Sequence, residues 1–197
     1  MFRLEEYKKW LSGKEKIKYN LSSIQKFKFP ENIVKIFSEI GLPKKVEPSI
    51  IFLEEKDNGL IRLNKYYDLS DEDYTDEFIN EINNKLEKYI VIGKTTGHAI
   101  CFDNEYKLYY VDYGNYNEVF INKSIEEFLE CIMYYDKMVS SIMHRNKDMD
   151  LEFEDYLDYI IESDILELKN DLLSVVNGSL SDYKFWNCKI GYLTDEL

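Results

Sequence analysis

Residues 89–136 hold the pattern that decides the fold, and they read YIVIGKTTGHAICFDNEYKLYYVDYGNYNEVFINKSIEEFLECIMYYD. Four short segments in this stretch are rich in β-branched and aromatic residues, as strands usually are. They cover residues 89–93, 98–103, 107–113 and 118–122. From Ser124 the apolar residues recur at helical spacing, and Ser124 and Glu127 form a capping box. The stretch predicts an α+β fold in which an antiparallel β-meander sheet of about five to six strands packs against helices.

Two helices are predicted near the N-terminus. Residues 2–11 carry aromatic and apolar side chains at roughly helical spacing, and a Ser-Gly pair follows them. A second helix is expected over residues 30–40, because Pro30 suits a first turn and Gly41 suits the position after the last one.

A β-hairpin and a third helix are expected before the central stretch. Residues 49–54 and 60–67 are strand-like and flank Asn58-Gly59, a pair that favours hairpin turns. A helix should start at about Thr75 and turn three apolar residues inward: Phe78, Ile82 and Leu86.

The C-terminal quarter is predicted to be helical. The helix that starts at Ser124 should end near residue 146, and two helices should follow it. The first would bury Phe153, Leu157, Ile160 and Ile161, and the second would start at a capping box formed by Asp164 and Glu167. The tail has Phe185, Trp186, Ile190 and Leu193 at helical spacing. We expect a single domain over residues 1–197, with a core at about 29–147 and a helical C-terminal extension, 148–197, packed on it.

The net charge of the chain limits the class of partner that it can bind. The net charge is −13, and it is uneven: residues 1–50 carry 11 Lys and Arg against 6 Asp and Glu, whereas residues 151–197 carry 3 against 11. Direct nucleic-acid binding is therefore not expected, because phosphate contacts need a basic surface. A basic protein is a better partner, since opposite fields raise encounter rates. The alternative is that the acidity only keeps the protein in solution.

Several features of the sequence predict a cytoplasmic protein with no membrane partner. The N-terminus has no uninterrupted apolar core of the kind that signal peptides carry, and no run reaches the length of a membrane span. The three cysteines, Cys101, Cys131 and Cys188, are scattered and odd in number, which argues against a disulfide framework.

The residues that could take part in catalysis do not have the spacing that catalytic motifs require. Gly93-Lys94-Thr95 resembles the end of a phosphate-binding loop, but the first glycine of that motif is missing and the next segment is strand-like. His98 and Cys101 are three residues apart on a predicted strand, so their side chains should point to opposite faces. The only other histidine, His144, falls at a helix end, and no zinc-binding spacing occurs. The sequence predicts no enzyme activity, no metal and no cofactor.

A run of acidic residues interleaved with tyrosines is the candidate binding site. Its acids are Asp71, Glu72, Asp73, Asp76 and Glu77, and its aromatics are Tyr66, Tyr67 and Tyr74. A calcium loop would need a glycine and a glutamate at spacings that this run lacks. Aromatic anchors rimmed by charge are typical of protein interfaces. The alternative is that the tyrosines pack beneath the loop, which leaves the acids merely solvated.

Three stretches carry a further signal: Ile-Gly-Leu-Pro at 40–43, the strand series YIVIG, AICFD and KLYYVDY, and Ile121 to Leu129, which reads INKSIEEFL. Together these motifs resemble the SUKH superfamily, most closely its fourth subfamily of bacterial immunity proteins. Phe185-Trp186 is similar to a late aromatic pair in that family. The match is good over residues 29–145 and looser elsewhere.

This resemblance implies a protein that binds and neutralises a cognate bacterial toxin, commonly a nuclease, by covering it without turnover. The partner would be a basic, nuclease-like protein, which the charge of this chain suits. The alternative function is a small regulatory or scaffold adaptor that binds proteins and has no toxin partner. A homodimer, formed through exposed aromatic residues or an edge strand, also remains open.

Overall fold

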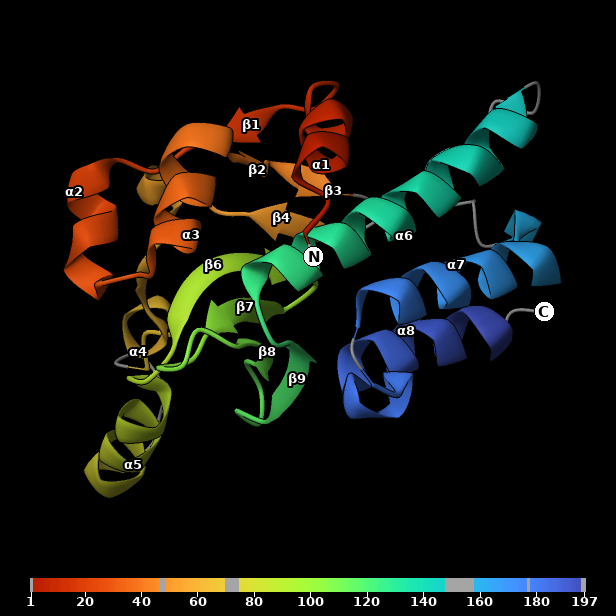
Figure 1. The fold of residues 1–197 in the computed structure, drawn as a ribbon. Coiled ribbons are helices and arrows are strands. Elements are labelled where there is room, and N and C mark those ends of the chain that lie inside the picture. Colours follow the sequence, from red (N-terminus) through yellow and green to blue (C-terminus); the bar gives the residue numbers. More distant parts are fainter. Residues whose placement is uncertain (1, 47–48, 70–74, 148–157, 177, 196–197) are drawn as a thin grey trace.

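The four strands predicted from the central stretch lie next to one another in a seven-stranded antiparallel sheet, and the last of them is an edge strand (Figure 1). The computed structural model describes residues 2–46, 49–69, 75–147, 158–176 and 178–195. The sheet strands are β3 Lys45–Val46, β4 Ile50–Phe52, β5 Ile61–Arg62, β6 Ile90–Thr95, β7 His98–Phe102, β8 Leu108–Asp112 and β9 Glu118–Asn122. Their order is β3-β4-β6-β7-β8-β9, and β5 also pairs with β6. The predicted α+β class is confirmed, with a larger sheet than expected.

Both faces of the sheet are buried, and each has its own apolar cluster. Along β7, Ile100 and Phe102 belong to the cluster under α6 (Ile125–Arg145). Ala99 and Cys101 alternate with them and face the other cluster, which includes side chains of α4 (Leu63–Tyr66) and α5 (Asp76–Leu86). The period of two along a strand thus places helices on both faces of the sheet.

The predicted hairpin over residues 49–67 is wrong, because β4 and β5 do not pair with each other. Both pair antiparallel with β6, with Phe52 opposite Gly93 and Ile61 opposite Val91. The residues between them leave the sheet edge through a 3-10 turn, η3 Glu55–Asp57, and return to it. Gly59 passes so close to the returning chain that a Cβ there would lie 2.2 Å from the Leu53 carbonyl oxygen. Only glycine fits at this position.

The N-terminal segment contains both predicted helices and a small second sheet. Its elements are α1 Leu4–Leu11, β1 Lys16–Ile17, α2 Leu21–Ile24, η1 Gln25–Phe27, α3 Glu31–Lys35, η2 Ile36–Ile40 and β2 Leu42–Pro43. The second predicted helix is α3 with its last turn, η2, wound as a π-helix, and it ends at Gly41 with φ at 96°. β1 and β2 pair antiparallel next to the main sheet.

Two buried carboxylates of α6 hold this N-terminal segment in place. Asp136 accepts a hydrogen bond from Trp10 Nε1 at 2.8 Å and pairs with Lys14 Nζ at 2.9 Å. Glu130 accepts the backbone N–H of Arg3. Acids are rarely buried unless they are paired, and these two are paired with residues more than 120 positions away.

The C-terminal helices are part of the main core. They are α7 Glu162–Val175, η6 Leu180–Asp182 and α8 Lys184–Asp195. One apolar cluster contains residues from Tyr7 to Leu193, and it includes the four tail residues predicted inward: Phe185, Trp186, Ile190 and Leu193. Figure 1 shows α7 and α8 side by side below α6. Of the helix predicted before them, Phe153 and Leu157 lie outside the described residues; Ile160 is buried and Ile161 is exposed.

The Ser124 cap predicted at the start of α6 is confirmed, although Glu127 reaches back one residue further than a capping box requires, and the second predicted box is misplaced. Ser124 Oγ accepts from the Glu127 amide at 3.2 Å, while the Glu127 carboxylate accepts from the Lys123 amide at 3.1 Å. In α7 the helix begins at Glu162, so Asp164 is its third residue rather than its cap. The Asp164 carboxylate accepts from the backbone N–H of Ile161 at 3.0 Å.

Asp164 also joins α7 to α6. Arg145, the last residue of α6, binds both Asp164 carboxylate oxygens, at 3.0 and 2.7 Å. Burial opposes ionisation of this carboxyl, but Arg145 and the Ile161 amide outweigh it and hold the pKa of Asp164 below its usual range. A lowered native pKa stabilises the fold above the unfolded value of about 3.9, and the contribution is lost as pH falls through the native pKa.

Replacing Asp164 with asparagine should therefore destabilise the protein in a pH-dependent way. At pH 7 we expect the free energy of unfolding to fall by about 1.5–3 kcal/mol, the range for hydrogen bonds to a charged group. The difference from wild type should shrink between about pH 5 and pH 2. Urea unfolding at several pH values measures it, with Glu162→Gln on the exposed side of the same turn as the control. A difference that stays constant with pH would contradict the ionic role.

Candidate partner-binding surface

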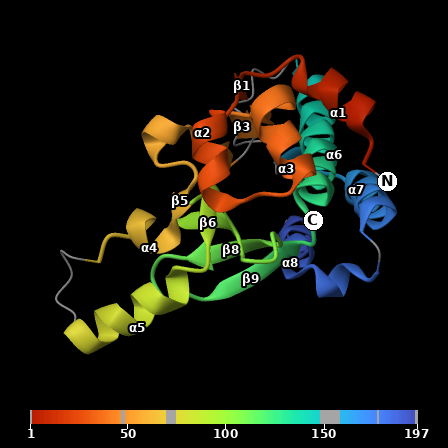
Figure 2. The same ribbon diagram turned by 60° about the vertical axis from the view of Figure 1, so that its left-hand side comes forward.

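The eight residues predicted to bind a partner fall into three groups. Asp71, Glu72, Asp73 and Tyr74 lie outside the described residues. Tyr66 and Tyr67 lie at the end of α4, and Asp76 and Glu77 form the first turn of α5. In both ribbon views α5 extends from the body of the molecule at the end away from α7 (Figures 1 and 2).

The start of α5 follows directly from its sequence. Thr75 caps the helix and accepts from the Phe78 amide at 3.3 Å. Asp76 and Glu77 are exposed in the first turn, where the helix dipole favours negative charge. Glu81 is exposed one turn later. These three acids define the α5 acidic face.

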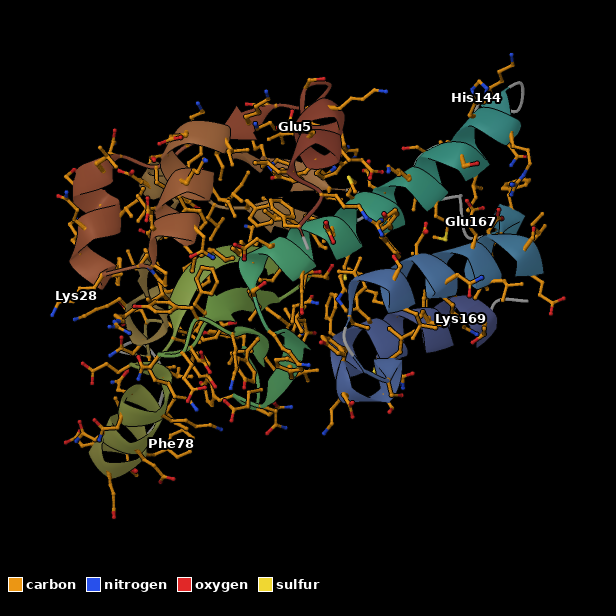
Figure 3. All side chains as sticks on the ribbon, in the orientation of Figure 1. Glu5, Lys28, Phe78, His144, Glu167 and Lys169 are labelled. Atoms are coloured by element: carbon orange, nitrogen blue, oxygen red, sulfur yellow. The ribbon has the colours of Figure 1, made fainter. Side chains whose placement is uncertain are left out.

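Phe78 was expected to point inward, and this is wrong. Its side chain is 37 % exposed, and Figure 3 shows it at the periphery. At about 100° per residue, Phe78 lies about 80° around the helix from Leu86, so it falls at the margin of the buried stripe. Ile79 packs against the core instead, next to the buried Ile82. An aromatic ring thus borders the α5 acidic face.

Tyr67 has a structural role. Its side chain is 4 % exposed, and its hydroxyl donates to the Val111 carbonyl and accepts from the Ala99 amide, both at 2.8 Å. Ala99 and Val111 are directly opposite each other in β7 and β8. The Tyr67 hydroxyl therefore joins the end of α4 to the sheet. The alternative that the tyrosines pack inward thus holds for Tyr67.

Tyr66 lines a cavity of about 390 Å³ beside the β6–β7 turn. We call it the aromatic cavity; its other lining residues are Tyr67, Lys94, Thr95, Gly97, His98 and Tyr113. Tyr66 is partly buried, and Tyr113 is 41 % exposed. The Tyr67 and Tyr113 rings meet edge to face with centroids 4.9 Å apart. The cavity offers aromatic walls to an inserted side chain, and Gly97, at φ 75°, shapes its rim.

No nucleophile and base pair forms at this site. His98 stacks on Tyr110, with centroids 4.5 Å apart, and its Nδ1 lies 3.3 Å from an Asp112 oxygen. Cys101 is buried on the opposite face of β7, where burial raises the pKa of its thiol. This confirms the expected geometry of the pair. Lys94 and Thr95 continue β6 as a strand, so the phosphate-loop reading fails as expected.

Tyr113, Lys94 and Gly97 are site residues that the acidic run did not indicate. Each lies more than 15 positions beyond that run, in or just after β6 or β8, two strands that finish at the same end of the sheet. A glycine and an aromatic residue directly after predicted strands were the available signal.

Comparisons of the whole chain add nothing to this geometry. No family model, curated protein or solved structure matches it.

Among the described residues, no group of three or more His, Cys, Asp or Glu side chains could hold a metal ion. In the same part of the chain, no helix combines the length and apolar character needed to cross a membrane. His144 is exposed near the end of α6, far from the aromatic cavity (Figure 3).

Proposed function

We propose that this protein is an immunity protein that binds a cognate bacterial toxin, a nuclease, and neutralises it by covering its active site. The observation that carries the proposal is the α5 acidic face, exposed next to a phenylalanine on a helix that packs against α4. The last residue of α4, Tyr66, lines the aromatic cavity. The motifs shared with the SUKH immunity proteins at residues 40–43 and 89–129 support the proposal. Neutralisation of this kind needs binding alone, with no catalysis by this chain.

Electrostatic attraction would bring this chain and the toxin together. A nuclease binds phosphates through a basic cleft, and the −13 charge of this chain complements such a cleft. Opposite fields accelerate association, while desolvated aromatic contacts slow dissociation. Asp76, Glu77 and Glu81 supply the charge, and Phe78 and Tyr66 supply apolar contact. The site of action is the bacterial cytoplasm, where a nuclease toxin meets its substrate.

A toxicity-rescue assay tests the proposed function. The gene upstream of the one encoding this chain is expressed in a bacterial host with and without this protein. If the neighbour is a toxin, growth should be restored only when this protein is present, and the purified pair should form a complex. A neighbour that binds without being toxic would support the adaptor function instead. Toxicity that this protein does not relieve would refute the proposal.

Charge reversal locates the binding face. The triple variant Asp76→Lys, Glu77→Lys and Glu81→Lys should slow association with the toxin by about 10- to 100-fold at low salt, because steering depends on the local field. Stopped-flow mixing at two salt concentrations measures the rate. The matched control reverses three exposed acids at the other end of the molecule: Asp158→Lys, Glu162→Lys and Glu167→Lys. An equal effect of both triples would mean that net charge, rather than α5, guides binding.

A further inference from the structure

A second cavity, larger than the aromatic one, lies between α8 and the sheet. Its volume is about 450 Å³, and it opens to the surface on the side of the sheet that α8 covers. The residues that line it are Ser49, Thr95, Thr96, Tyr110, Val119, Phe185, Cys188, Lys189 and Tyr192. We call it the α8 cavity. Its volume falls within the range of about 300–1,000 Å³ typical of small-molecule sites.

The walls of the α8 cavity are mostly apolar and aromatic. Phe185 of α8 faces Tyr110 of β8, with ring centroids 6.1 Å apart, and Val119 of β9 lies beside them. Two further lining residues, Thr95 and Ser49, bond to each other through their hydroxyls at 3.0 Å. Aromatic walls with a few polar groups suit a flat apolar molecule that carries one polar group.

Lys189 is the basic residue among those that line the α8 cavity. This side chain is largely buried, and no carboxylate in the described part of the chain pairs with its ammonium group. Its Nζ lies 5.9 Å from the Phe185 ring centroid. Burial lowers the pKa of Lys189 because the charged form loses water. In a chain with 38 acidic residues and 25 basic ones, a largely buried lysine without an acidic partner in the described residues is available to an external anion.

We propose that the α8 cavity binds a small aromatic carboxylate, whose ring packs against the contacting side chains of Phe185 and Tyr110 and whose carboxylate pairs with Lys189. The bound anion would supply the partner that the ammonium group lacks, in a site with little water, where such a pair is strengthened. The aromatic walls select for a flat ring over an inorganic anion. This site is separate from the α5 acidic face, and its occupancy does not depend on the proposed toxin binding.

Cys188 provides a direct readout of occupancy. Of the three cysteines, Cys101 and Cys131 are buried, whereas Cys188 is exposed and lines the α8 cavity. Alkylation of the folded protein by iodoacetamide should therefore occur at Cys188. We expect saturating 2-naphthoate to slow this alkylation severalfold, and its uncharged analogue 2-naphthalenemethanol to have much less effect at the same concentration.

Variants of Lys189 test the charge. Lys189→Met should weaken 2-naphthoate binding by about tenfold, the effect of one charge-assisted hydrogen bond worth about 1.4 kcal/mol. Lys189→Arg should bind 2-naphthoate about as tightly as the wild type does. Lys184→Met, at an exposed position of the same helix, should leave the affinity unchanged. Isothermal titration calorimetry measures binding, and thermal unfolding checks that each variant is folded.

Three results would overturn the proposal. They are no protection of Cys188 by 2-naphthoate, equal protection by the uncharged analogue, and unchanged affinity in a folded Lys189→Met variant. The second and third would show an apolar crevice that does not recognise an anion. None of these results bears on the toxin-rescue assay, so the two proposals can fail separately.

Discussion

Replacing Trp186 with alanine should lower the free energy of unfolding by about 3–5 kcal/mol, the usual cost of truncating a buried Trp. The side chain is 1 % exposed and packs against Phe128 and Tyr135 of α6. Its Nε1 donates to the buried Asn122 Oδ1 at 2.8 Å. One residue of α8 thus connects the last strand of the sheet with its longest helix. Chemical denaturation monitored by circular dichroism measures the change.

Two companion variants separate the contributions of Trp186. Trp186→Phe retains an aromatic ring but leaves Asn122 Oδ1 without this donor, which should cost about 1–3 kcal/mol beyond the smaller ring volume. Tyr192→Ala removes an aromatic side chain of the same helix that is 55 % exposed, and it should cost no more than about 0.5 kcal/mol. If Trp186→Ala were no worse than Tyr192→Ala, α8 would not be part of the core.

The parts of the fold that could be predicted are those whose signals are local in sequence. Strands β6 to β9 and helix α6 follow from composition, period and one capping box, all within residues 89–145. The pairing of β4 and β5 is not local, because both join β6, which lies about 30 residues or more further along the chain. Asn58-Gly59 does supply a positive φ, at Asn58, but it ends a 3-10 turn at the sheet edge. An Asn-Gly pair can thus occur in a hairpin turn or, as in this chain, at the end of a 3-10 turn.

The sequence also did not reveal that two acidic residues of α6 are buried. Glu130 and Asp136 are two of the polar residues of an amphipathic helix, and residue type alone assigns such residues to the surface. They are buried because Arg3, Trp10 and Lys14, from the opposite end of the chain, bond to them. Their burial depends on tertiary partners, so no window of sequence around α6 could indicate it.

The candidate surface was predictable only where exposure follows from helix position. Asp76 and Glu77 precede a buried stripe and face solvent, as their place in the first turn implies. Tyr66 and Tyr67 are adjacent at the end of a short helix and both line the aromatic cavity, but only Tyr67 is buried, with its hydroxyl bonded to the sheet. Composition cannot distinguish them, because tyrosine suits both environments.

The variant Tyr67→Phe separates a structural tyrosine from a binding one. Loss of its hydroxyl leaves the Ala99 amide and the Val111 carbonyl without this partner in the interior, so we expect unfolding to become easier by about 2–4 kcal/mol. Ala99 is the only alanine in the chain, so selective ¹⁵N-alanine labelling gives one amide signal. That signal should shift in Tyr67→Phe, and its hydrogen exchange should accelerate by at least the ratio of the unfolding constants.

Tyr66→Phe is the matched control, one residue earlier on the same helix. It should change stability by less than about 0.5 kcal/mol and leave the Ala99 signal in place, because the described contacts include no hydrogen bond from the Tyr66 hydroxyl to the sheet. Tyr66→Ala should weaken toxin binding without unfolding the protein, whereas Tyr67→Phe should leave the affinity of the folded fraction unchanged. If Tyr67→Phe lowered that affinity while the Ala99 amide stayed protected, Tyr67 would contact the partner and the assignment of roles would be reversed.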